Sequence, residues 1–250
     1  MQTQRQLNIL SAGAAQGVVV ALAAQLRTET GAEIKATFGA VGAILERLMA
    51  GEACDLIILT HPQIADLTAQ GRVLPDSAAD LGTVHTGVAV RAQDPPPAVS
   101  SAEGLRAALL AAESIYFPDP IKATAGIHFA KVIDSLGIRS MIESRLRTYP
   151  NGATAMRAMV DERTVTRNAR LIGCTQVTEI NITPGAVLAG VLPKEFELAT
   201  IYSVGVCAKL TSANPDADCI AIARRFAGML TAESSRALRA SAGYEFPPAT

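Results

Sequence analysis

Four side chains with acid or base chemistry stand at or near predicted strand-to-helix junctions: His61, Lys122, His128 and Glu179. Imidazole, ammonium and carboxyl groups around one bound molecule can remove a proton and return it. Three of these positions also have a structural interpretation. His61 can cap the helix that Pro62 begins, and Lys122 can be a solvated loop lysine. His128 can be a neutral packed imidazole, because the helix dipole disfavours its protonation.

Four junctions between a predicted strand and a predicted helix are rich in small residues. They are SAGAAQG (11–17), TFGAVGAI (37–44), FPDPIKATAGIHF (117–129) and YPNGATAMR (149–157). The first N–H groups of a helix carry partial positive charge, so such turns can hold an anion without a cationic side chain. Thr124 and Asn151 are candidate N-caps. The dinucleotide fingerprint and the phosphate loop are both missing from the first junction. Tight corners without a ligand are the alternative.

The elements that position these junctions alternate along the chain. Strands are predicted at 7–10, 32–39, 55–60, 85–92, 114–117, 144–149, 169–176 and 197–210. Helices are predicted after residue 16, at 43–51, 62–71, 102–113, 124–137 and 152–162, and between 216 and 243. Ser100 with Glu103 predicts a capping box. Repeated strand–helix units imply an α/β fold with mostly parallel sheets flanked by helices.

Composition excludes several classes of function. The 250 residues suffice for one large α/β domain or two smaller lobes. A net charge of −1 without long charge runs gives no sign of nucleic acid or an anionic membrane surface as a partner. Aromatic residues make up only 4%, which argues against a base-stacking platform. No apolar run reaches the roughly 18 residues of a membrane span.

Neither a metal nor another cofactor is expected. Cys54, Cys174, Cys207 and Cys219 lack C-x-x-C spacing, and most lie in or beside apolar strand-like runs, so free thiols are predicted. His61, His85 and His128 lack metal-ligand spacing. The opening MQTQRQLNIL shows no secretory leader, so the chain as written is expected in the cytoplasm, whereas a chain trimmed of its leader would be periplasmic.

The order of these segments resembles the type II periplasmic-binding-protein family, in its molybdate-binding (ModA-like) branch. The likeness includes LMAGEACDLIILTHPQIADLTAQGRVLPDS (48–77), TGVAVRA (86–92) and AGYEFPP (242–248). The resemblance implies a two-lobed α/β fold, with residues 1–85 plus 203–250 in lobe 1 and 86–202 in lobe 2. Crossover strands near 83–90 and 196–203 would form the hinge, and the ligand would lie between the lobes.

Departures from that branch bear on the ligand. Its molybdate binders place a serine hydroxyl after the first strand and another in the turn after the second, where this chain has Ala14 and the pair Ala40 and Val41. Methyl groups favour a ligand with carbon, so a small di- or tricarboxylate is expected rather than molybdate. The predicted ligand-binding residues are Gly13, Ala14, Ala40, Val41, Thr60, Lys122, Thr124, Ala125, Asn151, Gly152, Thr154, Gln176, Thr178 and Tyr202.

Two functions fit these observations. The first is a solute receptor that hands its ligand to the permease of an ABC importer if the chain is exported. The second is an isomerase, because the branch also resembles aconitate isomerase. An allylic proton shift needs a base, an acid and N–H donors for the dienolate, with His61, His128, Lys122 and Glu179 as candidates. A Ser-His-Asp hydrolase is not expected, since the chain has no G-x-S-x-G elbow.

Overall fold

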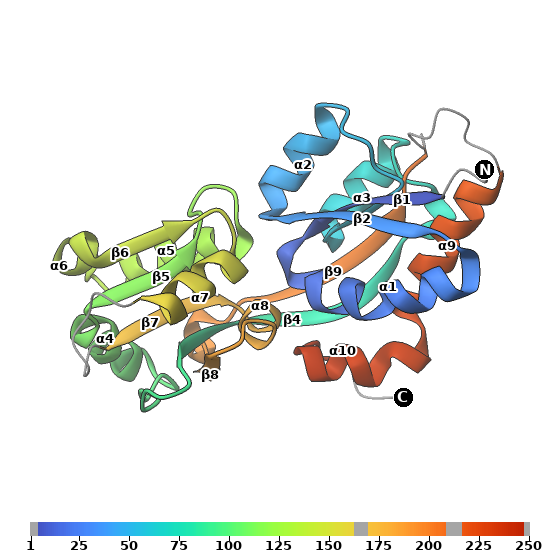
Figure 1. Ribbon diagram of the computed structural model, residues 1–250. Coiled ribbons are helices and arrows are strands. Elements are labelled where there is room, and N and C mark those ends of the chain that lie inside the picture. Colours follow the sequence, from blue (N-terminus) through green and yellow to red (C-terminus); the bar gives the residue numbers. More distant parts are fainter. Residues whose placement is uncertain (1–4, 163–169, 209–216, 248–250) are drawn as a thin grey trace. The chain divides into compact units, whose positions relative to one another are not determined.

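The computed structural model describes residues 5–162, 170–208 and 217–247 (Figure 1). The chain forms two compact units, and each is described by itself. Unit 1 comprises Met1–Thr83 and Thr200–Thr250, and unit 2 comprises Val84–Ala199. The sequence-based expectation placed these boundaries after residues 85 and 202. Strand β4 (Ala79–Arg91) and strand β9 (Ala199–Val206) contain the two crossings between the units.

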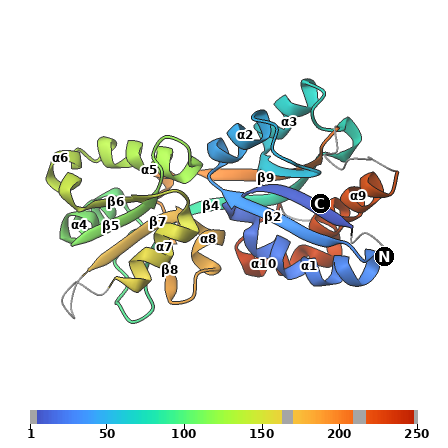
Figure 2. The same cartoon turned by 45° about the horizontal axis from the view of Figure 1, so that its top comes forward.

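In unit 1 the sheet has the strand order β2-β1-β3-β9. Strand β1 (Gln6–Ala12) pairs in parallel with β2 (Glu33–Gly39) and β3 (Leu56–Thr60), and β9 runs antiparallel to β3. Residues Leu56–Leu59 are all buried, as expected for a continuous apolar strand inside an α/β sheet. The helices of unit 1 are α1 (Gln16–Thr30), α2 (Val41–Met49), α3 (His61–Ala69), α9 (Ala217–Thr231) and α10 (Arg236–Ala242). Helix α1 lies beside α9 (Figure 2).

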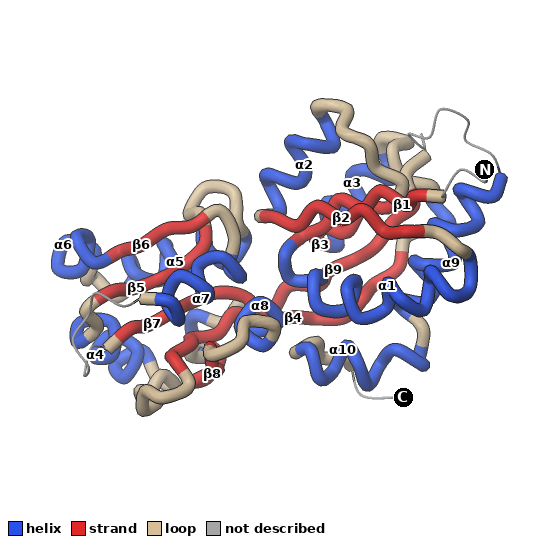
Figure 3. Tube along the Cα trace, viewed as in Figure 1, coloured by secondary structure: helices blue, strands red, loops and turns tan. Residues whose placement is uncertain are grey.

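Unit 2 has a mixed sheet. Strand β5 (Ser114–Pro118) is parallel to β6 (Leu146–Tyr149) and to β7 (Leu171–Gln176), whereas β4 runs antiparallel to β7 and to β8 (Ala186–Val191). The strands of the unit are the red segments of Figure 3, and its helices are blue. The helices are α4 (Ala102–Ala111), α5 (Thr124–Ser135), α6 (Arg139–Ile142), α7 (Gly152–Asp161) and α8 (Val177–Asn181). Phe117 meets Phe129 edge to face, with ring centroids 5.4 Å apart, in a core that β5 shares with α5.

Short 3₁₀ turns complete the fold at Gly13–Ala15, Pro75–Ser77, Glu143–Arg145, Lys194–Phe196 and Glu233–Ser235. No helix within the described ranges combines the length and the apolar character needed to cross a membrane. Four parts of the predicted segments lie outside the described residues: Ala169 of the strand at 169–176, Lys209 and Leu210 of the last strand, Asp216 at the start of the last helical region, and Pro248 of AGYEFPP.

Helix caps confirm one sequence prediction and correct three. The side chain of Asn151 accepts a hydrogen bond from the Thr154 N–H at the start of α7, as predicted. Helix α4 is capped by Ser101, whose hydroxyl accepts from the Gly104 N–H, so the predicted Ser100 cap is wrong by one residue. Helix α5 has Ala123 at its N-cap, with Thr124 as its first residue.

The start of α3 also differs from the prediction. Thr60, and not His61, is the N-cap, and it forms a capping box with Gln63. His61 is therefore the first residue of the helix and Pro62 the second. Proline is well suited to this turn, because the N–H group that it lacks would have no partner within the helix. The interpretation of His61 as the cap is wrong, and its imidazole is left for another partner.

Candidate functional site

A group of buried polar side chains without hydrogen-bond partners lies in unit 2. Gln176 is 2% exposed, and neither its Oε1 nor its Nε2 atom has a partner. The hydroxyls of Thr178 and Thr86 are buried and likewise have none. Buried polar atoms are nearly always paired with protein or water, and each one left unpaired destabilises a fold by about 1–3 kcal/mol. These three side chains form the Gln176 cluster.

The strand register explains how this cluster forms. Thr86 of β4 stands directly opposite Gln176 in the antiparallel β4–β7 pair. Gln176 ends β7 and is the N-cap of α8, and Thr178 follows in the first turn of that helix. The cluster offers amide N–H and hydroxyl donors together with one amide acceptor, which suits an anion that also carries a donor group. Gln176 and Thr178 are predicted ligand residues, and Thr86 was missed. Thr200, in unit 1, has a buried hydroxyl without a partner too.

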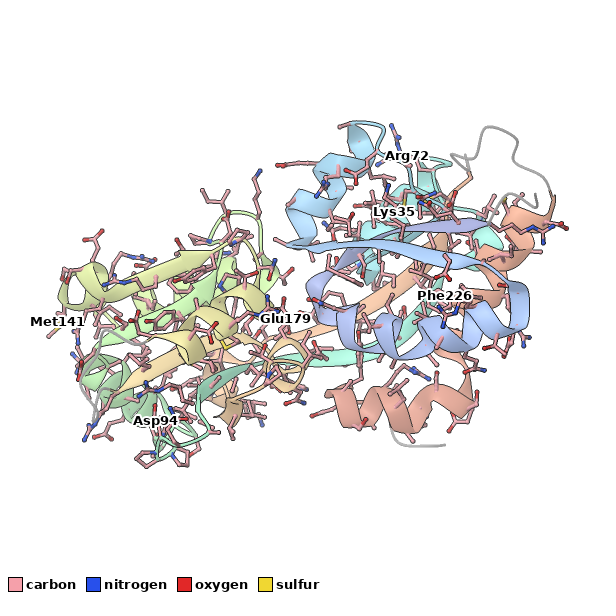
Figure 4. All side chains as sticks on the ribbon, in the orientation of Figure 1. Lys35, Arg72, Asp94, Met141, Glu179 and Phe226 are labelled. Atoms are coloured by element: carbon pink, nitrogen blue, oxygen red, sulfur yellow. The ribbon has the colours of Figure 1, made fainter. Side chains whose placement is uncertain are left out.

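Glu179 lies in α8 next to Thr178, but its carboxyl group already has hydrogen-bond partners within the protein. Its carboxylate accepts hydrogen bonds from the Thr175 hydroxyl at 2.6 Å and from the Gly152 N–H at 3.1 Å. Helix α7 therefore begins against α8, and Figure 4 labels Glu179 on the latter. Burial raises the pKa of the Glu179 carboxyl, although these hydrogen bonds and those from the Ala153 and Gln176 N–H groups act in the opposite direction.

The contact between Glu179 and Gly152 limits what the N-terminus of α7 can bind. The Gly152 N–H is used by Glu179 and the Thr154 N–H by the side chain of Asn151. A Cβ atom at position 152 would lie 1.9 Å from the Thr175 Oγ1 atom, so only glycine fits here. A negative side chain from the protein stands where a ligand was predicted. The ligand role of Asn151, Gly152 and Thr154 stays a prediction.

The remaining predicted residues of unit 2 lie around α5. The His128 Nε2 atom lies 2.7 Å from the carbonyl oxygen of Phe196, so Nε2 carries the hydrogen and the ring is fixed by the backbone. The Lys122 N–H donates to the Asp119 side chain at 3.1 Å in the loop before the helix. Thr124 begins α5, and Ala125 is buried in its first turn. Their ligand and catalytic roles stay predictions.

A second group of polar residues lies in unit 1. The His61 Nδ1 atom is 2.8 Å from the Asp80 Oδ1 atom, and the Ser203 hydroxyl donates to the same oxygen at 2.5 Å. The three side chains border a hollow of about 470 Å³, whose other lining residues, such as Ile64 and Ala79, come from the same unit. An ionised carboxylate only accepts, so Nδ1 carries the hydrogen and Nε2 is the basic nitrogen.

This arrangement is not the triad of a serine hydrolase. The Ser203 hydroxyl lies 3.4 Å from Nδ1, the nitrogen that already faces Asp80. In a hydrolase the serine contacts the opposite ring nitrogen, which takes its proton. His61 and Asp80 instead form a dyad in which the His61 Nε2 atom can act as a base on a bound substrate. His61 was a predicted candidate, whereas Asp80 and Ser203 were missed because each is distant from it in sequence.

The small-residue turns of unit 1 are apolar and buried. Gly13 and Ala14 form the 3₁₀ turn before α1, and the Ala14 carbonyl accepts a hydrogen bond from the Tyr244 hydroxyl at 3.1 Å. Ala40 is the N-cap of α2 and Val41 its first residue. Thr60 and Tyr202 stand opposite each other in the β3–β9 pair, and Tyr202 is 2% exposed. Their ligand roles stay predictions.

Comparison with known proteins agrees with this architecture. Residues 7–245 match the family described as bacterial extracellular solute-binding protein. A curated aconitate isomerase from Pseudomonas sp. is 26% identical over 217 residues, which cover 84% of this chain and 78% of that protein.

Two solved structures have the same fold at low identity. The periplasmic molybdate-binding protein of Azotobacter vinelandii superimposes with a TM-score of 0.72 at 17% identity, over 96% of this chain and 99% of that one. The sulfate-binding protein SubI of Mycobacterium tuberculosis gives 0.65 at 14% identity, over 98% and 88%. At these identities the likeness concerns the fold, so the ligand has to be argued from this chain's own residues.

Proposed function

This chain belongs to the bacterial extracellular solute-binding proteins, and from that premise we propose that it binds a small organic anion, a di- or tricarboxylate, through the Gln176 cluster. The observation that carries the proposal is the buried Gln176 amide with both of its polar atoms unpartnered. Burying such a group is unfavourable in the free protein and becomes favourable once a ligand completes its hydrogen bonds.

The chemistry of the cluster favours a carboxylate over an inorganic tetraoxyanion. Molybdate and sulfate dianions present only acceptor oxygens, which leave the Oε1 atom of Gln176 without a donor. A hydroxylated carboxylate offers acceptors to the amide N–H and the threonine hydroxyls, and a hydroxyl donor to Oε1.

As a receptor the protein would act outside the cytoplasm and deliver its ligand to the permease of an ABC importer. Titration calorimetry on protein freed of ligand by unfolding and refolding tests the binding step. The panel is citrate, malate, succinate, cis-aconitate, trans-aconitate, molybdate and sulfate. We expect saturable one-to-one binding of carboxylates, with malate tighter than succinate because only malate has the hydroxyl. Binding of molybdate or sulfate without any carboxylate would overturn the proposal.

A variant pair links the binding to the cluster. Gln176→Leu removes the amide while keeping a similar volume, and we expect the affinity for the best carboxylate to fall at least tenfold, the equivalent of about 1.4 kcal/mol. Gln25→Leu changes an exposed glutamine of α1 and is expected to leave the affinity unchanged. Equal affinities in the two variants would show that Gln176 does not take part in binding the carboxylate.

A second candidate function is an isomerase that shifts a double bond in an unsaturated tricarboxylate. The His61–Asp80 dyad favours it, together with the 26% identity to an aconitate isomerase. The neutral His61 Nε2 would remove an allylic proton, the C–H electrons would enter a dienolate conjugated with the carboxylate, and the imidazolium would return the proton at the far carbon. One double bond moves and no redox partner is needed.

Proton NMR of cis- and trans-aconitate in deuterated water separates the two functions. An isomerase incorporates solvent deuterium into the substrate, and His61→Gln is expected to lower that rate about 10²- to 10⁴-fold, as for loss of a general base. His128→Gln tests the other candidate histidine, whose ring contacts the Phe196 carbonyl. A comparable loss of rate there, with His61→Gln unaffected, would assign the base to His128 instead. Binding without any deuterium incorporation would leave the receptor function alone.

A further inference from the structure

Two cysteines that are far apart in the sequence meet in unit 1. The Sγ atoms of Cys54 and Cys207 lie 3.4 Å apart, although 153 positions separate them in the chain. Both are buried, with exposed fractions of 2% and 4%. Cys174 is buried in unit 2, and Cys219 belongs to α9. The close pair is therefore a specific feature of the fold of unit 1.

The backbone on both sides of the pair is fixed by pairing between strands. Cys54 lies just before β3 and Cys207 just after β9, at the end of the ladder where Leu56 stands opposite Val206. The Cys207 N–H donates to the Asp55 carbonyl at 3.0 Å, and Cys207 also forms an isolated bridge with Val73. Strand pairing thus holds the two main chains next to each other, with the sulfur atoms only 3.4 Å apart.

We propose that Cys54 and Cys207 form a disulfide when the chain folds in the presence of a disulfide oxidant. The sulfur atoms move from 3.4 Å to the bonded distance of about 2.05 Å. A thiolate of one cysteine attacks the oxidant, a low-molecular-weight disulfide, and releases one thiol. The second cysteine then attacks the mixed disulfide, so one protein S–S bond forms, the oxidant's S–S bond breaks, and two oxidant thiols carry away the protons.

Folding is the stage at which the reaction proceeds. The hydrogen-bond contact with Cys54 and burial raise the pKa of the Cys207 thiol, so the thiolate is disfavoured once unit 1 is packed. In the open chain both thiols are exposed and can react. The strand pairing of unit 1 then selects Cys207 as the partner of Cys54, ahead of Cys174 and Cys219.

The bond has a particular consequence in this chain. Unit 1 consists of two separate segments, and the whole of unit 2 lies between them in sequence. Cys54 belongs to the first segment and Cys207 to the second, so their bond joins the two segments covalently. The loop that it closes is long, and the chain-entropy model gives large stabilisation for such loops because the unfolded ensemble is restricted.

The experiment compares the full-length protein refolded with oxidised and reduced glutathione and the same protein refolded with excess reductant. After denaturation, alkylation and digestion, we expect a linked peptide pair that contains Cys54 and Cys207, with a mass about 2 Da below the sum of the free peptides. We also expect the Tm of the oxidised protein to exceed that of the reduced protein by roughly 5–15 °C.

Two variants keep the result interpretable. Cys54→Ala is expected to remove the linked peptide and the difference in Tm between the two preparations, whatever it does to the absolute Tm. Cys174→Ala changes a buried cysteine of unit 2 and is expected to keep both. Recovery of Cys54 and Cys207 as alkylated thiols from the oxidising preparation, or pairing of either one with Cys174 or Cys219, would overturn the proposal. These outcomes do not depend on which anion the protein binds.

Discussion

The carboxylate of Glu179 lies 3.1 Å from the backbone nitrogen of Gly152, so an acidic side chain at the start of α8 occupies the positive end of α7. The Thr175 hydroxyl donates to the same carboxylate from β7. These contacts fix one strand and two helices of unit 2 in the immediate neighbourhood of Gln176. The partners of Glu179 thus shape the site without depending on a ligand.

Replacement of Gly152 by alanine should strongly destabilise unit 2. The added Cβ would lie 1.9 Å from the Thr175 Oγ1 atom and 2.1 Å from the Glu179 Oε2 atom, so the hydrogen bonds between these groups must break. We expect a loss of about 2–4 kcal/mol in the free energy of unfolding, measured by urea denaturation.

Gly228→Ala is the control for that measurement. Gly228 lies in α9, and no atom outside its local helix lies within 4 Å of an added Cβ. Alanine favours a helix over glycine by about 0.5–1 kcal/mol, so this variant should be slightly more stable than the parent. A loss in Gly152→Ala no larger than in Gly228→Ala would contradict the contact with Glu179.

Glu179 should make the stability depend on pH. Its pKa is raised from 4.5 in the folded protein, so the folded state holds the proton more tightly than the unfolded state. The free energy of unfolding therefore falls as the pH rises from about 4.5 to the raised value. The slope from one proton approaches about 1.4 kcal/mol per pH unit in that window. Denaturation curves measured across pH check the direction.

Glu179→Gln should remove this part of the pH dependence, because an amide does not titrate. Glu113→Gln, at an exposed position, is expected to leave it in place. A fall in stability with rising pH that is as steep in Glu179→Gln as in the parent protein would show that another group causes the effect.

Removal of the unpartnered hydroxyls should separate stability from binding. Thr86→Val and Thr178→Val replace a buried hydroxyl without a partner by a methyl group of similar size. We expect the ligand-free variants to be as stable as the parent, or up to about 1–2 kcal/mol more stable, and to bind the anion more weakly. Thermal unfolding with and without citrate measures both effects.

Thr183→Val is the contrasting control, since that hydroxyl donates to the Glu179 carbonyl at 2.8 Å and its loss should destabilise the protein. Destabilisation of all three variants alike would mean that the hydroxyls already have partners.

Local pattern accounts for much of the fold. The unbroken apolar run at 55–60 predicts the buried strand β3, and Asn151 before a helical pattern predicts the cap of α7. Strand β8 was missed because its sequence AVLAGV (186–191) is a short run of apolar residues and glycine, and periodicity does not assign such a run to a strand. The cap at Ser101 was misplaced by one residue because two serines stand side by side.

The candidate sites of the two units were harder to predict, because their contacts join residues that are distant in sequence. Gln176 and Thr178 could be predicted because they stand at the end of an apolar strand. Thr86 could not, because it joins them only through the pairing of β4 with β7. Asp80 meets Ser203 across 123 positions, and Glu179 meets Gly152 across 27. No local periodicity encodes such pairs, because they depend on how whole strands and helices pack.

The division of unit 1 between two chain segments also bears on synthesis. Strand β3 needs β9 to cover one of its edges, yet β9 belongs to the last quarter of the chain. While the ribosome makes unit 2, the residues of β3 that become fully buried, such as Ile57 and Ile58, have an unpaired edge. A growing chain with such an apolar edge is prone to aggregation until its final strand is made.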